Sequence, residues 1–310
     1  MGIGRKSMSP YKVEHLKSPI TLPEDSATSE RWQYRNRMWW DTQPMRYDHR
    51  EKILAEPGSP EYFNEIDGRF FGAVRQFMPW KHIPFDPLID FQSLAFKDVL
   101  EVGVGYGSHA ALLAPSSRSF TGIDLTHGAC VMTKRRFELL NLRADILRMD
   151  AEHMSLRDES FDYIWSWGVI HHSANPVRMI HEIYRTLRPG GEAVIMVYHR
   201  SFWKYFVEAG LARGVFRGDW FRFGSLSGIV QAASDGAMAR FYTREEWCEL
   251  CRGLFEVSQV QFFGQKTDLF LIPHGTLKNF VIRLVPDRVT RFISNTLGFG
   301  SFLVARMRKI

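Results

Sequence analysis

The stretch DVLEVGVGYG, from Asp98 to Gly107, decides the fold of this 310-residue chain. Its first half is nearly continuous in apolar residues and predicts a buried central strand. Three glycines then follow at alternate positions, Gly103, Gly105 and Gly107. In α/β proteins, a strand that ends in such a turn and opens into a helix brings bare backbone against a nucleotide-like ligand.

An acidic residue after the next strand adds to this pattern. The segment Ser119–Ile123 predicts a second strand that ends at Asp124, about 20 residues beyond the first glycine, where a carboxylate can accept both hydroxyls of a ribose. A dinucleotide-binding turn would read G-x-G-x-x-G, and its third glycine would fall at Ser108. The glycines instead read G-x-G-x-G, with Glu101 two residues ahead. A nicotinamide-dinucleotide oxidoreductase is therefore the less favoured alternative.

The run from Glu101 to Gly107 resembles motif I of the class I S-adenosylmethionine (SAM) methyltransferases, E/D-x-G-x-G-x-G. The later segments GVIHHSANP and HEIYRTLRPGG resemble the ubiquinone- and menaquinone-type small-molecule methyltransferases. The resemblance runs from Lys97 to His199 and is specific for the enzyme class rather than for a substrate. It implies an α/β fold with a seven-stranded, mostly parallel, doubly wound Rossmann-like sheet in the order 3-2-1-4-5-7-6, with the last strand antiparallel. It also implies SAM as the cofactor.

The same resemblance implies roles for individual residues around the cofactor. Glu101 and the Gly103 backbone would hold the methionine end, and Asp124 would hold the ribose. Asp150 and the N–H of Ala151 would meet the adenine, while Ser166 and Trp167 would lie beneath the sulfonium. The expected cofactor-binding residues are Glu101, Gly103, Gly105, Gly107, Asp124, Leu125, Asp150, Ala151, Glu152, Ser166 and Trp167.

The expected catalytic residues are His171, Tyr198 and His199. The predicted fifth strand ends at Tyr198 and His199, which points both at the cofactor cleft, and His199 is the candidate general base. One histidine of the pair His171-His172 is expected at the mouth of the site; the alternative is a hydrogen-bonded loop histidine. No metal site is predicted, because no third ligand has suitable spacing. The C-x-x-C of WCELC falls inside a helix capped at Thr243, which disfavours redox chemistry.

The distribution of residue types along the chain predicts three parts. Residues 1–29 read as a flexible arm, and residues 30–96 as an aromatic-rich helical lid over the cofactor. Residues 97–310 form the SAM-binding domain. Two insertions in that domain, 201–240 before the sixth strand and 264–300 after it, are expected to recognise the acceptor. Because the first insertion is rich in Phe and Trp, we expect an apolar or aromatic small molecule.

The charge distribution and the composition limit the classes of partner that we expect. Residues 278–310 hold seven Lys or Arg and one Asp, whereas the catalytic core shows no basic stripe, so nucleic acid is not an expected partner. The basic amphipathic segment 277–297 predicts peripheral membrane contact, with packing on its own protein as the alternative. With three cysteines, no apolar signal core and no spanning run, the chain is expected in the cytoplasm. No oligomeric state is predicted.

These features together predict a SAM-dependent methyltransferase. It would transfer a methyl group to a hydrophobic or aromatic small molecule by direct SN2 displacement, mainly through proximity and orientation. The alternative that keeps the same SAM pocket is a protein that no longer methylates and serves as a pericyclase or a regulatory partner.

Overall fold

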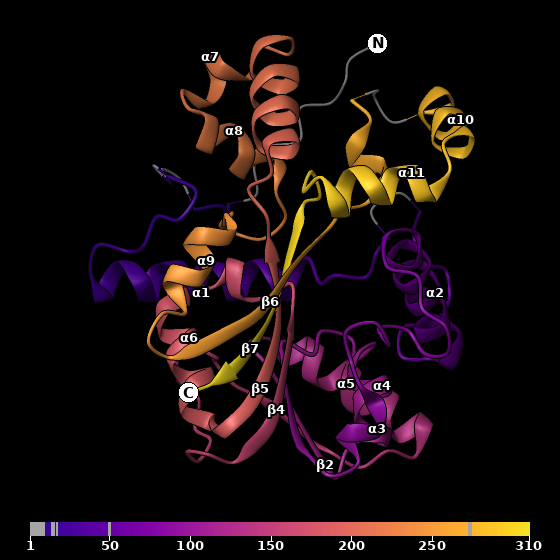
Figure 1. Cartoon of the computed structure of the whole chain (residues 1–310), viewed down its shortest axis with the longest axis vertical. Coiled ribbons are helices and arrows are strands. Elements are labelled where there is room, and N and C mark those ends of the chain that lie inside the picture. The colour runs from indigo at the N-terminus through magenta and orange to yellow at the C-terminus, as the bar shows by residue number, and fades with distance from the viewer. Residues whose placement is uncertain (1–9, 14–15, 17, 49–50, 272–274) are drawn as a thin grey trace.

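The computed structural model describes residues 10–13, 16, 18–48, 51–271 and 275–310 (Figure 1). Seven strands form one sheet in the order β3-β2-β1-β4-β5-β7-β6. The strands are β1 (Asp98–Val102), β2 (Ser119–Asp124), β3 (Asp145–Arg148), β4 (Phe161–Trp167), β5 (Leu187–Tyr198), β6 (Phe255–Phe263) and β7 (Phe302–Lys309). Only β7 runs antiparallel to its neighbours, β5 and β6. The structure confirms the predicted fold class and strand order.

The central position of β1 follows from its sequence. Leu100 pairs with Thr121 of β2 on one side and with Ile164 of β4 on the other, so the strand has no free edge. Val99 and Leu100 are both fully buried, because each faces a layer of helices. The parallel strands all end at the same side of the sheet, and this brings their following loops together.

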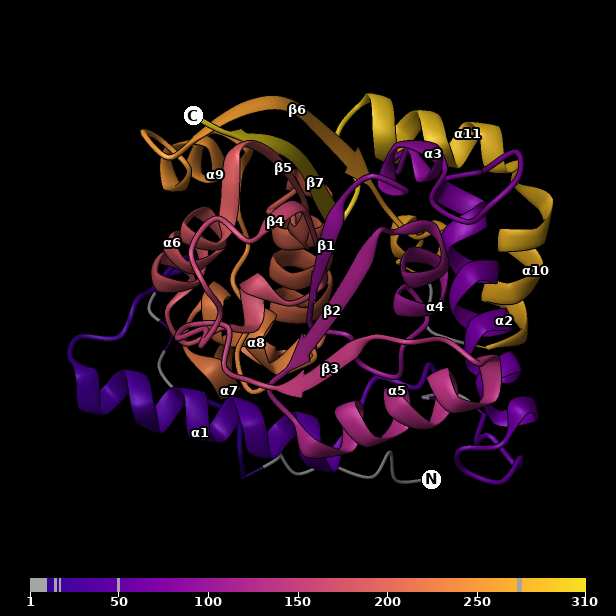
Figure 2. The same cartoon turned by 90° about the horizontal axis from the view of Figure 1, so that it is seen from below.

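Helices cover both faces of the sheet (Figure 2). The main ones are α1 (Ser26–Thr42), α2 (Pro60–Phe77), α3 (Phe91–Leu94), α4 (Ala110–Leu113), α5 (His127–Leu140), α6 (Pro176–Thr186) and α9 (Arg244–Leu250). Side chains of α2, α4 and α5 pack on one face, and those of α6 and α9 on the other. Local signals set the starts: Ser59 and Thr126 cap α2 and α5, and Thr243 forms a capping box with Glu246 at α9.

Both predicted insertions lie at the end of the sheet where the parallel strands finish (Figure 1). The first forms η3 (Phe202–Val215), α7 (Asp219–Phe223) and α8 (Leu226–Ala233). The second forms η4 (Lys266–Leu269), α10 (Thr276–Leu284), α11 (Asp287–Arg291) and η5 (Phe292–Thr296). Two short helices, η1 (Ala114–Ser116) and η2 (Ile170–His172), complete the fold. Among the described helices, none is both long and apolar enough to cross a bilayer.

The N-terminal segment differs from the expected free arm wherever it is described; residues 1–9, 14–15 and 17 lie outside the description. Val13 and Leu16 are buried, and the N–H of Val13 donates to the carbonyl of Ala237 at 2.8 Å. The Lys12 ammonium donates to the main-chain carbonyls of Gln231 and Ser234 at 2.8 and 2.6 Å. Burial of these apolar groups and pairing of the ammonium fix the segment against the first insertion.

Candidate cofactor and acceptor site

The glycine turn after β1 presents bare backbone to a cavity. Gly103 and Gly105 both line that cavity and both have positive φ, of 84° and 52°. A Cβ on Gly103 would lie 2.3 Å from Cγ2 of Val169, whereas a Cβ on Gly105 would meet no protein atom within 4 Å. Gly105 therefore keeps open a space that a side chain would otherwise enter. Gly107 has positive φ but does not line the cavity; its Cα faces Thr133 and Arg136 of α5.

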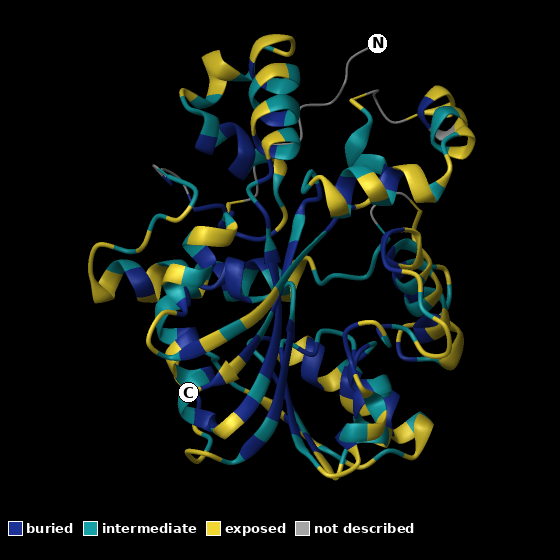
Figure 3. Cartoon of the chain, viewed as in Figure 1, coloured by how far each residue is buried: buried dark blue, intermediate teal, exposed yellow. Residues whose placement is uncertain are grey.

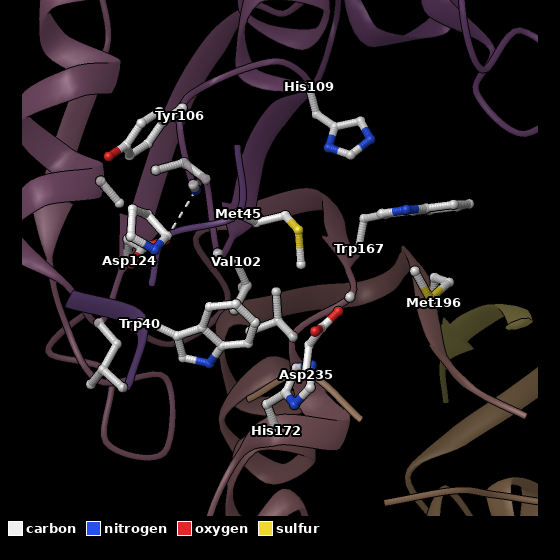
Figure 4. A pocket seen from close by; sticks show the side chains of 18 of the residues that line it. Trp40, Met45, Val102, Tyr106, His109, Asp124, Trp167, His172, Met196 and Asp235 are labelled. Atoms are coloured by element: carbon white, nitrogen blue, oxygen red, sulfur yellow. Dashed lines mark hydrogen bonds between the residues drawn. The ribbon is translucent and has the colours of Figure 1, made fainter. Parts of the chain in front are cut away.

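Asp124 closes the other side of this turn. Its Oδ2 accepts from the N–H of Gly105 at 3.0 Å, and its Oδ1 accepts from the N–H and hydroxyl of Thr126, both at 2.9 Å. Burial raises the pKa of the Asp124 carboxyl, and these donors act against that shift. The carboxylate lines the cavity beside the glycine backbone (Figure 4). The structure thus brings Gly103, Gly105 and Asp124 together, as the spacing predicts.

The cavity has a volume of about 450 Å³ and extends well beyond the glycine turn. That volume lies within the range of about 300–1,000 Å³ that small-molecule sites occupy. One end is bounded by Gly103, Gly105, Asp124, Leu125 and Ala151. The rest of the lining is mainly apolar and includes Met45, Phe70, Phe77, Trp167, Met196 and Phe302. In Figure 4, Trp167 and Met196 lie across the cavity from Asp124. A polar end built from backbone and carboxylate therefore continues into an apolar chamber.

Glu101 lies behind the cavity wall rather than on it. Its side chain is 1% exposed, and Oε1 is 3.7 Å from Nδ1 of His109, which does line the cavity. Oε2 is buried without a hydrogen-bond partner among the described residues. Burial, with Asp124 nearby, raises the pKa of the Glu101 carboxyl well above its usual value. An unpaired carboxylate oxygen behind the glycine turn fits a cofactor that carries an ammonium group, because such a group supplies the missing donor.

The segment after β3 is only partly at the cavity. Ala151 lines it, but Asp150 does not: its Oδ1 accepts from Nε2 of Gln33 at 2.8 Å and from the N–H of Glu152 at 2.9 Å. Glu152 is buried away from the cavity, where its Oε1 accepts from the hydroxyl of Ser173 and the N–H of Asn175. Because α1 delivers Gln33 to Asp150, that carboxylate is already engaged by protein. Glu152 orders the loop after η2 instead of facing a ligand.

Strand β4 separates the two residues expected beneath the sulfonium. Trp167 lines the cavity, whereas Ser166 is fully buried and donates its hydroxyl to the carbonyl of Val102 at 3.3 Å. Successive side chains of a strand point to opposite faces, so only one of the two can reach the cavity. Leu125, at the end of β2, lines the cavity as expected.

Of the two adjacent histidines, His171 and His172, only one lines the cavity. His171 is fully buried, stacks on Tyr198 with ring centroids 3.8 Å apart, and does not line the cavity. His172 lines it and donates Nδ1–H to the carbonyl of Met238 at 2.7 Å. Since a carbonyl can only accept, this bond assigns the proton to Nδ1 and leaves a lone pair on Nε2. Burial lowers the pKa of His172 to about 3, so the ring is neutral at pH 7.

His199 does not reach the site, in contrast to the expectation of a general base. Its Nδ1 hydrogen-bonds to the carbonyl of Gly300 at 2.8 Å, and its ring stacks on Phe262 with centroids 4.2 Å apart. It lines no part of the cavity. Tyr198, one position earlier, faces the opposite way and does line it. The alternation of a strand again decides which of two neighbours is available.

Several cavity residues, among them Met45, Asp235 and Gln265, were not singled out from the sequence. Asp235 enters the cavity from the loop after α8, and neighbouring Gly236 packs so tightly on His172 that a Cβ there would lie 2.4 Å from Nδ1 (Figure 4). Within the predicted lid, Trp40 and Met45 line the cavity, while the other large aromatics of α1 do not. Further lining residues are Tyr47, Val74, Thr126, Met179 and Gln265. Their positions depend on tertiary packing, and no local motif marks them.

Other reactive groups lie outside the site. Cys251 is fully buried in the turn that ends α9, and burial raises the pKa of its thiol to about 12, which makes it unreactive. Among the described residues, no three His, Cys, Asp or Glu side chains gather in a way that could hold a metal ion.

Comparisons with known proteins agree with this geometry. Residues 100–195 match the family described as methyltransferase domain. The chain is 27% identical over 160 residues to a ubiquinone biosynthesis O-methyltransferase of Hydrogenovibrio crunogenus, covering 49% of this chain and 64% of that protein. It is 38% identical over 100 residues to a phthiotriol/phenolphthiotriol dimycocerosates methyltransferase of Mycobacterium tuberculosis, covering 32% of this chain and 36% of that protein. The chain thus spans less than two thirds of the length of these relatives.

Solved structures show the same kind of similarity at lower identity. The crystal structure of the [4+2]-cyclase SpnF is 18% identical, with a TM-score of 0.46, and the match covers 83% of this chain and 84% of that one. From its fold and its family match, the chain contains a methyltransferase domain of the class I, SAM-dependent kind. S-adenosylmethionine is the cofactor of this domain.

Proposed function

We propose that the protein transfers a methyl group from SAM to an apolar or aromatic small-molecule acceptor. The observation that carries this proposal is the single cavity with two unlike ends. One end offers glycine backbone and the carboxylate of Asp124, and the other offers a mainly apolar chamber. When bound, SAM supplies an electrophilic methyl group on a sulfonium.

The glycine end supports cofactor binding. In this proposal Gly103 and Gly105 give backbone contact, Asp124 accepts from the ribose hydroxyls, and Glu101 takes a bond from the ammonium group. The orphan oxygen of Glu101 and the open space at Gly105 support these roles. Ala151 and Leu125 border the same end. For Asp150, which does not line the cavity, an adenine contact would fall to Oδ2, because Oδ1 accepts from Gln33 and Glu152.

The apolar chamber supports the choice of acceptor. Phe70, Phe77, Met196 and Phe302 would exclude water from an apolar body and hold it by area burial. Trp40 and Trp167 offer aromatic faces to the same space. Aromatic faces stabilise cations, so they favour a bound sulfonium as well as an aromatic acceptor. Fixing the two reactants in one dry chamber is the main source of rate.

Three polar side chains in this chamber support a role in proton transfer. In our proposal Nε2 of His172 accepts the proton of the acceptor's nucleophile, and Asp235 stabilises the imidazolium that forms. Tyr198 adds a hydroxyl at the same place. Because the native ring is a weak base, proton transfer would accompany methyl transfer rather than precede it. His172 and Asp235 thus replace His171 and His199 as candidate catalytic residues.

The test is incubation of the protein with methyl-labelled SAM and fractionated cell extract. The expected result is label in a chloroform-soluble product together with stoichiometric S-adenosylhomocysteine. A fraction that is converted without S-adenosylhomocysteine would instead support the non-methylating alternative, a pericyclase. Label found only in water-soluble products would contradict an apolar acceptor.

Peripheral membrane contact through 277–297 is a second part of the proposal. The predicted apolar face of α10 is uncovered: Leu277, Phe280 and Leu284 are 65%, 59% and 65% exposed. Arg283 of α10 and Arg288 of α11 are also exposed, and neither has an ion-pair partner among the described residues. An apolar face with flanking cations favours an anionic lipid surface over packing on the protein itself.

A further inference from the structure

The first insertion carries an exposed apolar surface that the catalytic site does not use. Phe216 and Phe221 are 78% and 99% exposed, although side chains of this size normally find cover. They belong to a group at the outer part of η3 and α7 that we call the η3–α7 tip. The exposed apolar residues of this tip are Leu211, Val215, Phe216, Trp220 and Phe221.

Two arginine side chains lie among these apolar residues. Arg217 and Arg222 are both exposed, and neither forms an ion pair with any described residue. Arg222 instead lies over the ring of Phe223 at 5.0 Å. The acidic residue nearby, Asp219, is neutralised by Arg213 at 3.1 Å. The η3–α7 tip therefore presents apolar side chains and uncompensated positive charge together, which is the pattern of a surface that lies on anionic lipid.

The η3–α7 tip and helix α10 project from the same end of the molecule (Figure 1), and burial coloring shows both to be largely exposed there (Figure 3). A second cavity of about 230 Å³ lies between the two insertions, with Tyr205 of η3 on one wall and Asp268 of η4 on the other. Tyr198 and Phe302 line both this cavity and the larger one. The space between the insertions therefore adjoins the chamber proposed for the acceptor.

From these observations we infer that the η3–α7 tip is a second membrane-docking element, which binds an anionic lipid bilayer together with α10. Helix η3, which carries the tip, and η4, which precedes α10, line the second cavity, so docking through the tip and α10 turns that cavity toward the bilayer. An apolar acceptor dissolved in the lipid then reaches the chamber without crossing water, which removes the cost of exposing its apolar surface. This inference rests on the membrane contact proposed for 277–297 but not on methyl transfer.

The free arginines are the reason to choose lipid as the occupant. A protein partner or a second copy of the chain would cover Phe216 and Phe221 equally well, but it would have to supply acidic side chains for Arg217 and Arg222. An anionic bilayer supplies apolar depth and negative charge in one surface. The choice predicts that binding depends on lipid charge and weakens with salt.

The test is co-sedimentation of the full chain, without SAM, with vesicles of phosphatidylcholine or of phosphatidylcholine mixed with phosphatidylglycerol. Wild-type protein should sediment with the anionic vesicles, and Phe216→Glu combined with Phe221→Glu should reduce the partition coefficient about tenfold or more. Arg217→Gln should reduce it about fivefold, and only at low salt. Phe96→Glu is the matched control, because Phe96 is 79% exposed and follows α3, which lies at the opposite end of the molecule from α7 and α10 (Figure 1).

The outcomes separate the proposals. Loss of binding in Phe280→Glu with Leu284→Glu, but none in the η3–α7 variant, would overturn this inference and leave the α10 contact standing. A wild-type protein that ignores both kinds of vesicle would overturn both membrane proposals, while the labelling experiment still decides methyl transfer. Sedimentation velocity without lipid tests the other occupant: dimers abolished by Phe216→Glu with Phe221→Glu would assign the tip to a second copy. Circular dichroism confirms that each variant is folded.

Discussion

The cofactor end and the acceptor end of the cavity are built by different means. The cofactor end consists of main chain and short side chains at the tips of adjacent strands, Gly103 and Gly105 after β1 and Asp124 after β2. The acceptor end collects long side chains from distant parts of the chain, among them Trp40, His172 and Phe302. Strand pairing fixes the first end, whereas packing of insertions fixes the second. The cofactor end should therefore be rigid and should tolerate few substitutions, whereas the side chains of the acceptor end should be able to adjust to a substitution.

The largest effect is expected from Gly103→Ala. The added Cβ would lie 2.3 Å from Cγ2 of Val169 in a backbone with φ of 84°, and both the clash and the strain displace the turn. SAM affinity should fall about hundredfold, for about 3 kcal/mol, in isothermal titration calorimetry. The double variant with Val169→Ala removes the clash but not the strain, and should recover part of the loss. No recovery would show that the clash is not the cause.

At the acceptor end, His172→Gln should lower turnover about hundredfold while leaving the Kd for SAM unchanged, because the side chain serves the acceptor. Formation of S-adenosylhomocysteine with the identified acceptor measures the turnover. His199→Gln is the control, since that ring lies outside the cavity; turnover per folded molecule should stay near wild type. A larger effect at His199 than at His172 would return the role of base to His199.

Asp124→Asn tests the cofactor end more gently. The amide cannot replace both oxygens that accept from Gly105 and Thr126, and it removes a charge next to the bound cofactor. SAM binding should weaken by about 1–3 kcal/mol. The measurement is the same titration, with Ser166→Ala as a comparison whose hydroxyl faces away from the cavity. Equal affinity of wild type and Asp124→Asn would contradict the ribose assignment.

The last prediction concerns the pH dependence of the unfolding free energy. Burial lowers the pKa of His172 in the native protein to about 3, from its usual 6.5, so below pH 6.5 the unfolded chain binds a proton that the native chain does not. Wild type should therefore lose up to about 1.4 kcal/mol of unfolding free energy per pH unit from this group, until about pH 3. His172→Gln lacks that loss. Urea unfolding of both proteins between pH 7.5 and 4.5 should show converging curves; parallel curves would contradict a buried neutral ring.

The sequence predicted most of the sheet and the meeting of Gly103, Gly105 and Asp124, because both follow from local patterns. Strand β2 begins at Ser119 and ends at Asp124, as the sequence predicts, since an apolar run with turn residues on either side leaves little freedom in placing a strand. Gly103, Gly105 and Asp124 meet because parallel neighbours end together. The position of Asp150 was less predictable, because its partner Gln33 is 117 residues away in the chain.

The acceptor end escaped prediction for a geometric reason. The choice between His171 and His172, or between Tyr198 and His199, depends on a one-residue difference in which way a side chain points, and neither residue type decides that. Asp235 belongs to no motif at all and reaches the cavity because the first insertion folds back over the sheet. Prediction succeeded where the backbone itself forms the site and failed where side chains from separate elements must meet.

The position of the first insertion depends on the buried Lys12 of the N-terminal segment. Its ammonium donates to the carbonyls of Gln231 and Ser234 at the end of α8 and lies 4.8 Å from the ring centroid of Trp39. Ser234 directly precedes Asp235 in the chain. Burial lowers the pKa of Lys12 to about 8. An affinity tag or a protease cut just ahead of Val13 would thus act at a distance, loosening the loop that carries Asp235 into the cavity. Preparations that differ only in their leader peptide could then differ in catalytic rate while binding cofactor equally well.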